Sequence, residues 1–376
     1  MPHPPNSNAV ALHAPDHQSR SLTMSMHSNR LARAARWAAG PVAFLIVCLS
    51  ASVSHAYGYR TCDGNPIRYS SGWTNMYIST TSFPAGGNGD ARLQNAMWHW
   101  NNVKGSGFNF YVGRDTDGTH NDDNGRNEVY YDTSLSGSTL AVTRTRYHCY
   151  WLFGWNYGID ETDIGFNSNR SWTTGTFNYG SLGSPYSLES VALHELGHAL
   201  GLLHEDRWMA TMNSYYPNSG PLGYGKEWDP LPDDRLGERV IYPDSTTEVD
   251  VAGSAFKRTG SGSSGLVSST LSAARGSNVT IDVTFLNQST STQTFDINFY
   301  LSTNSYPSSA DTYLGSNYGA WGSEGAQITF SRTLTIPSSV SPGTYYLGYV
   351  IDPSNALSES DESNNPQPMP RTITIY

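Results

Sequence analysis

The stretch that decides the fold is HELGHALGLLH, His194–His204, which places three histidines and one glutamate within eleven residues. Its apolar residues recur at helical spacing, so we expect a helix within Ser187–Leu203. On such a helix His194 and His198 are four residues apart, and their imidazoles leave the same face one turn apart. Both side chains can therefore reach a single metal ion.

Three further residues complete this pattern. Gly201 follows His198 by three residues and can end the helix, because glycine adopts left-handed backbone angles at little cost. The turn brings His204 back as a third ligand. Three neutral imidazoles leave tetrahedral zinc one open position for water, as in catalytic sites. Glu195 is placed to contact that water as a general base.

A buried helix that merely carries histidines is the alternative explanation. A lone HExxH occurs by chance in many unrelated proteins, and a histidine on an apolar helix is more often a core residue. The full HExxHxxGxxH pattern fixes five positions, each with a mechanical reason, and therefore favours the metal site.

Over roughly Tyr57–Pro243 the chain resembles the metzincin clan of zinc endopeptidases. ATMNSYY, Ala210–Tyr216, resembles the methionine turn of that clan, and Met212 follows His204 at the spacing seen in matrixins. The resemblance implies an α+β catalytic domain, with a mixed twisted sheet and an active-site helix. It also implies that TDIGFNS, Thr162–Ser168, is the edge strand that binds substrate as an added strand.

Some features depart from the matrixin pattern. Glu205 directly follows the third histidine, as in astacins, where that glutamate pairs with the mature N-terminus. Ser214 stands where astacins and serralysins carry a zinc-facing tyrosine, and no matrixin-type propeptide is visible. The resemblance implies a bacterial, matrixin-like peptidase of undecided subfamily. It further implies that Tyr215, Tyr216 and Pro217 wall the pocket for the residue after the cut.

Residues 1–56 are expected to be a signal peptide with an N-terminal extension, outside the fold. A basic segment, Arg30–Arg36, precedes the apolar run Trp37–Ser52, which is too short and interrupted for a membrane span. A small-x-small pattern then predicts cleavage near Ala56, giving a secreted protein with no membrane span in its mature form. An uncleaved anchor is the alternative, and translation from Met24 or Met26 would shorten the extension.

The charge of the chain restricts its partners. Such a cut removes four arginines and one aspartate, so the net charge changes from −10 to about −13. A strongly acidic protein is a poor partner for nucleic acid or anionic membrane. We expect protein or peptide substrates as partners; the charge does not decide the oligomeric state, for which a monomer is expected.

Two cysteines, Cys62 and Cys149, remain after the predicted cut. In an oxidising compartment an even number of cysteines predicts a disulfide, here one that closes a long loop. The alternative is that the Cys62 thiolate occupies the zinc as an inhibitory switch.

An acidic segment, Arg114–Glu128, is dense enough in oxygen ligands to hold calcium, and metzincins often carry structural calcium. Its spacing fits no EF-hand, because Gly118 comes too early after Asp115, so a solvated acidic turn is favoured. His120 and His148 could belong to a second zinc site, but without paired spacing a surface position is favoured. The candidate calcium ligands are Asp115, Asp117, Asp122, Asp123, Asn124 and Glu128.

The rest of the zinc peptidase domain, residues 57–244, alternates helix and strand signals. Asp90–Val103 predicts a helix that Asp90 can cap, with Leu93, Ala96, Met97 and Trp100 on its buried face. Alternating aromatic and β-branched runs predict strands at Phe108–Gly113, Asn127–Thr133, Thr139–Tyr147 and Thr162–Ser168.

After Pro243 the composition changes. Residues 245–265 include a Gly/Ser-rich patch and are expected to be a linker or the start of a second domain. In 266–376 only strand signals occur, which predicts an all-β immunoglobulin-like sandwich. FYLSTN at Phe299–Asn304 and PGTYYLGYVID at Pro342–Asp352 resemble the cell-adhesion-related domain found in bacteria. A surface-binding adhesin with an inactive or ancillary protease-like domain is therefore the rival to a secreted zinc endopeptidase.

Overall fold

The computed structural model describes residues 6–13, 57–116, 120, 123–175, 185–206, 210–216, 229–254 and 271–376. The N-terminal domain is built on one sheet, with strand order β1-β8-β9-β7-β5-β6. Neighbours from β9 to β6 run parallel, whereas β8 is antiparallel to β9 and β1 is antiparallel to β8. The strands are β1 Asn6–His13, β5 Trp73–Ser79, β6 Asn109–Asp115, β7 Asn127–Asp132, β8 Thr139–Trp151 and β9 Trp155–Asn167.

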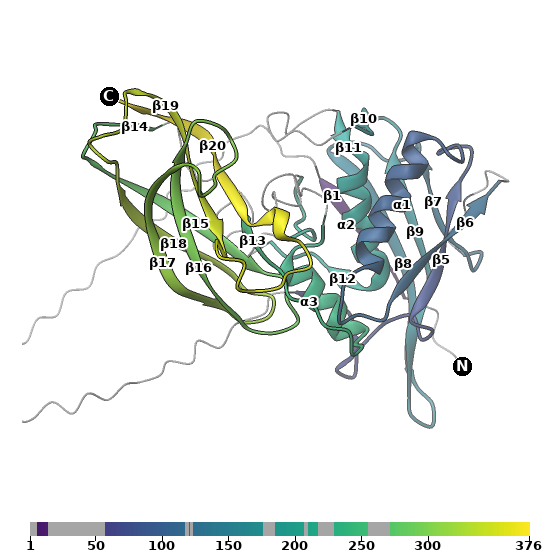
Figure 1. Cartoon of the computed structure of the whole chain (residues 1–376). Helices are drawn as coiled ribbons and strands as arrows, with labels where there is room; N and C mark the ends of the chain where they lie inside the picture. The colour runs from purple at the N-terminus through teal and green to yellow at the C-terminus, as the bar shows by residue number, and fades with distance from the viewer. Residues whose placement is uncertain are drawn as a thin grey trace, which may run out of the picture.

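Two helices, α1 (Asn88–Asn101) and α2 (Leu188–Leu200), lie side by side on this sheet (Figure 1). The predicted apolar face of α1 is buried, as expected, and Trp100 donates its indole N–H to the Leu193 carbonyl at 2.8 Å. Gly87 rather than Asp90 is the N-cap of α1. The Asp90 carboxylate instead accepts the Gly86 amide at 2.8 Å from inside the first turn. The mixed sheet with its active-site helix confirms the predicted α+β class.

The prediction that Thr162–Ser168 forms the edge strand is wrong. Thr162–Ser168 falls largely within β9, which lies between β8 and β7 and has no free edge. The strand on its outer side is β8, so β8 takes the edge position among the strands that follow residue 57. Sequence periodicity identifies strands but does not order them, because neighbouring strands in a sheet need not be consecutive in the chain.

The N-terminal segment also differs from expectation. Residues 1–56 were expected to lie outside the fold, yet Asn6–His13 forms β1 and pairs with β8 along its length. An edge strand presents unpaired backbone groups, and an extended segment that supplies the missing partners can add to it.

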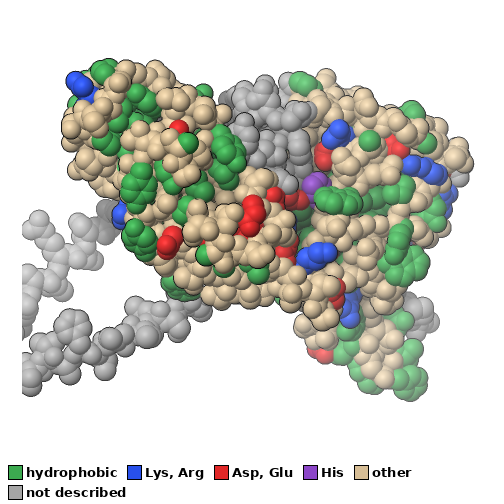
Figure 2. All heavy atoms as spheres, viewed as in Figure 1, with side chains coloured by type: hydrophobic (Ala, Val, Ile, Leu, Met, Phe, Trp, Pro, Cys, Tyr) green, Lys and Arg blue, Asp and Glu red, His purple; other side chains and the backbone are tan. Residues whose placement is uncertain are grey.

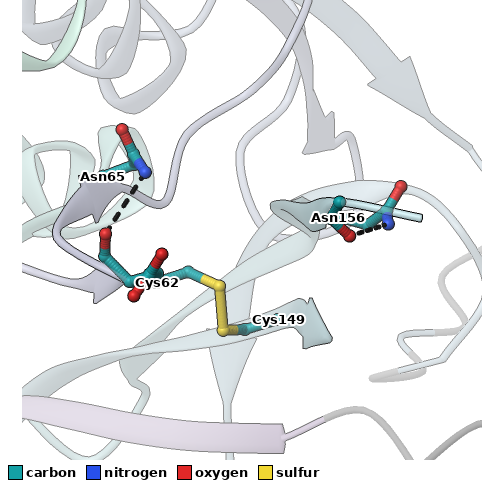
Figure 3. Close-up of a disulfide and its surroundings, with 6 residues drawn as sticks. Cys62, Asn65, Cys149 and Asn156 are labelled. Atoms are coloured by element: carbon teal, nitrogen blue, oxygen red, sulfur yellow. Dashed lines mark hydrogen bonds between the residues drawn. A yellow bond between two sulfur atoms is a disulfide. The ribbon is translucent and has the colours of Figure 1, made fainter. Parts of the chain in front are cut away.

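The predicted disulfide between Cys62 and Cys149 is present (Figure 3). It joins β3 (Thr61–Cys62) to β8, and β3 forms a small hairpin with β4 (Asn65–Pro66). Because the Cys62 sulfur is bonded to Cys149 and buried, the alternative of a zinc-blocking thiolate is not realised in this structure. Beyond Cys149, the tip of the β8–β9 hairpin exposes the apolar side chains Trp151, Leu152 and Phe153 (Figure 2).

Short elements complete the N-terminal domain. β2 (Gly58–Tyr59) pairs with β12 (Leu202–Leu203), which directly follows α2. β10 (Trp172–Thr173) pairs with β11 (Tyr186–Ser187). Neither β5 nor the third helix, α3 (Pro232–Ile241), was predicted from the sequence. Among the described residues no helix is long and apolar enough to cross a membrane.

The C-terminal domain is an all-β sandwich with its own buried core, as predicted. One sheet has the order β13-β15-β18 and the other β14-β20-β19-β16-β17. Its first strand, β13, lies within the interval expected to be a linker or domain start. The strands are β13 Val251–Ser254, β14 Leu271–Ala273, β15 Asn278–Asn287, β16 Gln293–Ser302, β17 Thr312–Gly322, β18 Gln327–Thr335, β19 Gly343–Ile351 and β20 Pro366–Ile375, with a short 3-10 helix at Glu362–Asn364.

Candidate metal centre and active site

The active-site helix α2 begins and ends as its sequence dictates. Ser187 is the N-cap, and its side chain accepts the Ser190 amide at 3.2 Å. Gly201 ends the helix in the left-handed region with φ 118°. A side chain there would also meet the Ile67 carbonyl oxygen, since a Cβ would lie 3.1 Å from it. Only glycine tolerates both conditions, and the chain turns at this point to bring His204 back.

The three histidines predicted as metal ligands converge. One ring nitrogen from each of His194, His198 and His204 lies within 4.8 Å of the others. His194 Nδ1 donates to the Thr211 carbonyl at 2.8 Å, and His198 Nδ1 donates to the Leu202 carbonyl at 2.9 Å. A carbonyl can only accept, so these bonds fix the proton on Nδ1 and leave each Nε2 lone pair toward the common centre.

The donor set fits a divalent transition metal. Burial lowers the pKa of His194 and His198 well below the usual range, so both rings are neutral, as ligands must be. His194 Nε2 lies 3.2 Å from His204 Nε2, and His198 Nε2 is buried without a hydrogen bond within the described part of the chain. At this distance the lone pairs of the His194 and His204 nitrogens repel each other unless a proton or a cation lies between them. Burial disfavours the proton, so a cation is favoured. Three imidazoles are a zinc donor set.

Glu195 is held beside this centre by a residue that sequence analysis missed. Thr143, on β8, donates its hydroxyl to Glu195 Oε2 at 2.5 Å, and both side chains are fully buried. Burial raises the pKa of Glu195 to about 8, and the bond from Thr143 opposes that rise. The other carboxylate oxygen, Oε1, is buried and makes no hydrogen bond to the described residues. That oxygen can therefore receive a proton from water.

Met212 packs against the helix that carries His194 and His198, because Gly197 makes room for its side chain. A Cβ on Gly197 would lie 2.3 Å from the Met212 sulfur, closer than real contacts allow. Asp234 of α3 holds the turn from the other side, since its carboxylate accepts the amides of Thr211 at 2.6 Å and Met212 at 3.1 Å. The Thr211 carbonyl in turn binds His194. Asp234 therefore positions a metal ligand through the methionine turn.

The remaining predicted residues near the centre occupy different environments. Tyr215 is exposed, whereas Tyr216 is buried and its hydroxyl accepts the Ser187 amide at 3.3 Å. Pro217 lies outside the described residues. Ser214, the position at which the resemblance left a possible tyrosine ligand missing, donates its hydroxyl to Asp206 at 2.8 Å.

Glu205, the astacin-like residue, is buried directly after the third histidine. Its backbone amide donates to the Met212 carbonyl at 2.9 Å, which ties the segment after His204 to the methionine turn.

The acidic segment gathers only part of the predicted calcium set. Ligand atoms of Asp115, His120 and Glu128 lie within 4.8 Å of one another, and the two carboxylates are buried. Asn124 donates to Glu128 at 3.1 Å, while Asp123 is paired with an arginine at 3.0 Å. Asp117 and Asp122 lie outside the described residues.

The two histidines of the hypothetical second zinc site do not share a ligand group. His120 stacks on the Tyr130 ring, with centroids 4.1 Å apart. His148 lies on β8 and is hydrogen-bonded to Asp160 at 2.7 Å.

Each half of the chain matches a known protein family. Residues 151–242 match the family model of the matrixins, and residues 266–367 match that of the CARDB domain. Mouse (Mus musculus) stromelysin-3 is 37% identical over 82 residues, which are 22% of this chain and 14% of that protein. Human (Homo sapiens) matrix metalloproteinase-25 is 35% identical over 80 residues, 21% of this chain and 13% of that protein. The chain therefore matches about one seventh of the length of these relatives.

Among solved structures, the crystal structure of a CARDB domain from Pyrococcus furiosus, in complex with di-metal ions, covers 34% of this chain and 90% of that chain. Its TM-score is 0.25 and its sequence identity 11%. The fold, the histidine triad and the family match define a zinc peptidase domain of the matrixin family. The chain carries this matrixin domain followed by a C-terminal CARDB domain.

Proposed function

We propose that the chain is an active zinc-dependent endopeptidase that hydrolyses peptide bonds in proteins. The observation that carries the proposal is the arrangement of Glu195, whose buried carboxylate lies beside the histidine triad and is oriented by Thr143. The matrixin match makes proteins the expected substrates.

The chain's own groups have separate roles in this reaction. His194, His198 and His204 would hold the zinc, which supplies a Lewis acid for the substrate carbonyl and a more acidic water. Glu195 takes a proton from the attacking water and passes it to the leaving nitrogen. Thr143 keeps the carboxylate in place, so that the proton moves between fixed atoms.

A Glu195→Gln variant tests the proposal. The amide keeps the shape of the side chain but cannot accept the proton, so casein hydrolysis should fall by at least about 100-fold. Zinc content should stay equimolar by elemental analysis. Glu362→Gln, which changes a carboxylate of the C-terminal domain, is the matched control. Near-normal turnover by Glu195→Gln would contradict the mechanism, and zinc-free, inert wild-type protein would favour the rival adhesin.

The same proposal includes export. We infer that the peptidase is secreted after cleavage near Ala56, on the strength of the basic segment, the apolar run and the small-x-small pattern before Tyr57. N-terminal sequencing of protein recovered from the culture medium tests this, and an intact N-terminus on cell-associated protein would support the anchor instead.

A second hypothesis of the proposal is that calcium binds in the segment between β6 and β7. Buried Asp115 and Glu128 favour a cation there, while His120 and the nearby Arg126 favour a structure held by ion pairs alone. Thermal unfolding with calcium and with a calcium chelator separates the two. An unchanged unfolding temperature would count against calcium.

A further inference from the structure

The β8–β9 hairpin extends beyond the body of the peptidase domain and ends in apolar side chains. The last residue of β8 lies opposite the first residue of β9, so a very short loop joins the two strands. In Figure 1 the hairpin projects below the sheet, and in Figure 2 hydrophobic side chains cover its end. We call the exposed large side chains at this end the apolar tip, which consists of Tyr150, Trp151, Leu152, Phe153 and Trp155.

The backbone of the apolar tip holds these side chains in solvent. Phe153 is 96% exposed and has a φ of 53°, in the left-handed region that a residue with a large side chain adopts only at a cost. The Leu152 N–H donates to the Gly154 carbonyl at 2.8 Å. The Asn156 side-chain amide donates to the carbonyls of Leu152 and Gly154 at 3.1 and 3.0 Å. Because these polar backbone groups are satisfied within the hairpin, the loop loses less when it leaves water.

The disulfide supports the hairpin directly below the apolar tip. Cys149 lies two residues before Trp151 and is bonded to Cys62, which ties this part of β8 to the β3–β4 hairpin. Thr143, which orients Glu195, lies on the same strand, and at the rise of an extended chain it is about 25 Å from Trp151. A surface that contacts the apolar tip therefore lies far from the catalytic centre.

The charge of the hairpin restricts what can bind there. Cys149–Ile159 contains no acidic or basic side chain. The next such side chains along the two strands, His148 and Asp160, are hydrogen-bonded to each other at 2.7 Å. The whole chain has a net charge of −10, so an anionic surface would repel it. The complementary partner is therefore apolar and without net charge.

The area of the apolar tip favours a lipid surface over another protein. An aromatic side chain buries about 150–250 Å² when it is fully covered, so at their exposed fractions the four aromatic residues offer roughly 400–600 Å². A stable protein interface buries about 800 Å² on each partner and has hydrogen bonds at its rim. Insertion into the interface of a bilayer needs only a few apolar side chains, and tryptophan and tyrosine prefer that depth.

We propose that the apolar tip inserts into the headgroup region of a zwitterionic lipid bilayer and holds the folded protein on a membrane surface. Trp151, Leu152 and Phe153 enter the apolar layer, and the disulfide keeps the base of the hairpin in place. This binding goes beyond the proposed peptidase function and uses neither the zinc ligands nor Glu195.

The first experiment measures binding of the full chain to phosphatidylcholine vesicles by co-sedimentation. A tip variant carries Trp151→Ser, Leu152→Ser and Phe153→Ser. Its partition coefficient should be at least about 100-fold below that of the wild type, because three apolar side chains no longer leave water on binding. An unchanged unfolding temperature shows that the tip variant is folded.

A matched control makes the same kind of change on the C-terminal domain. It replaces three exposed aromatic residues of β17 by serine, namely Tyr313, Tyr318 and Trp321. This control should bind vesicles as tightly as the wild type. Exchanging part of the phosphatidylcholine for phosphatidylserine should weaken binding at low salt, because the chain is acidic. Stronger binding to the anionic vesicles would overturn the assignment of a zwitterionic surface.

A conservative variant locates the contact. Trp151→Phe with Trp155→Phe keeps the tip apolar and should still bind phosphatidylcholine. Quenching of tryptophan fluorescence by brominated lipid should, however, be largely lost. Equal quenching in the wild type and in this variant would place other tryptophans in the bilayer and overturn insertion of the tip.

The remaining outcomes are also decisive. Unchanged vesicle binding by the tip variant, or no binding by the wild type, overturns the proposal. Loss of binding in both the tip variant and the β17 control indicates nonspecific adsorption and overturns it too. If the wild type ignores vesicles but self-associates in analytical ultracentrifugation, and the tip variant does not, the partner is a second copy of the chain and not a lipid.

Discussion

Replacing Thr143 by valine removes one hydrogen bond from the catalytic carboxylate while keeping the shape of the side chain. In the structure the Thr143 hydroxyl lies 2.5 Å from Glu195 Oε2, and neither side chain is exposed to solvent. A hydrogen bond to a charged group is worth about 1.5–3 kcal/mol. If that energy also orients Glu195 in the transition state, kcat/KM should fall by about 10- to 150-fold.

The assay is hydrolysis of a quenched fluorescent peptide by wild-type and Thr143→Val proteins with equal zinc content. Thr145→Val makes the same isosteric change two residues along β8 and is the control. Unfolding temperatures of the two variants show whether any loss comes from stability instead. A kcat/KM of Thr143→Val within twofold of wild type would refute the idea that this hydroxyl positions the base.

The remaining predictions concern packing, covalent structure and pH. Gly197→Ala should destabilise the fold by about 1–3 kcal/mol in chemical unfolding and weaken zinc binding, because its Cβ would meet the Met212 sulfur at 2.3 Å. Replacing both Cys62 and Cys149 by serine should cost about 4–5 kcal/mol of unfolding free energy, the entropy of the loop that separates them by 87 residues. Burial raises the pKa of Asp250 to about 8, so the folded state holds this proton more tightly than the unfolded state. Its contribution to stability is therefore fully present below about pH 4 and is lost as the pH rises to 8. Asp250→Asn should consequently gain more stability over wild type at pH 8 than at pH 5.

The zinc ligands and the active-site helix could be predicted because their information is local. The spacing of His194 and His198, and the need for glycine at position 201, follow from the geometry of one helix and its end. The helix caps confirm this reasoning, since Ser187 and Gly201 occupy the two ends.

The groups that orient those ligands could not be predicted in the same way. Thr143 reaches Glu195 across 52 residues of sequence, and Asp234 reaches Thr211 across 23. Neither residue has an unusual local pattern, so only the packing of β8 and α3 against α2 reveals them. A local signal for α3 itself was present in LPDDRLGERV, with proline at the first position and two acidic residues in the first turn.

The predicted position of the substrate-binding edge strand was wrong for a different reason. β8 and β9 form one long antiparallel hairpin, and both sequences alternate in the manner of half-buried strands. Which of the two is paired on both sides depends on β7 joining β9. The order of the strands in the sheet therefore decides which strand lies at the edge. The residues of a single strand carry no information about that order.

The helix α3 links the metal centre to the C-terminal domain. Asp234 near its start holds the methionine turn, while Arg239, one to two turns later, is buried and reaches the β-sandwich. The Arg239 guanidinium donates to the carbonyl of Gln288 at 2.8 Å and forms an ion pair with Glu324 at 3.2 Å. Without these two partners the buried guanidinium would keep the Lys104 carbonyl at 2.6 Å and Glu248 at 3.4 Å, but it would lose hydrogen bonds that a buried charge needs. The sandwich therefore contacts the same helix whose Asp234 holds the turn that positions His194, although all three histidines come from the N-terminal domain.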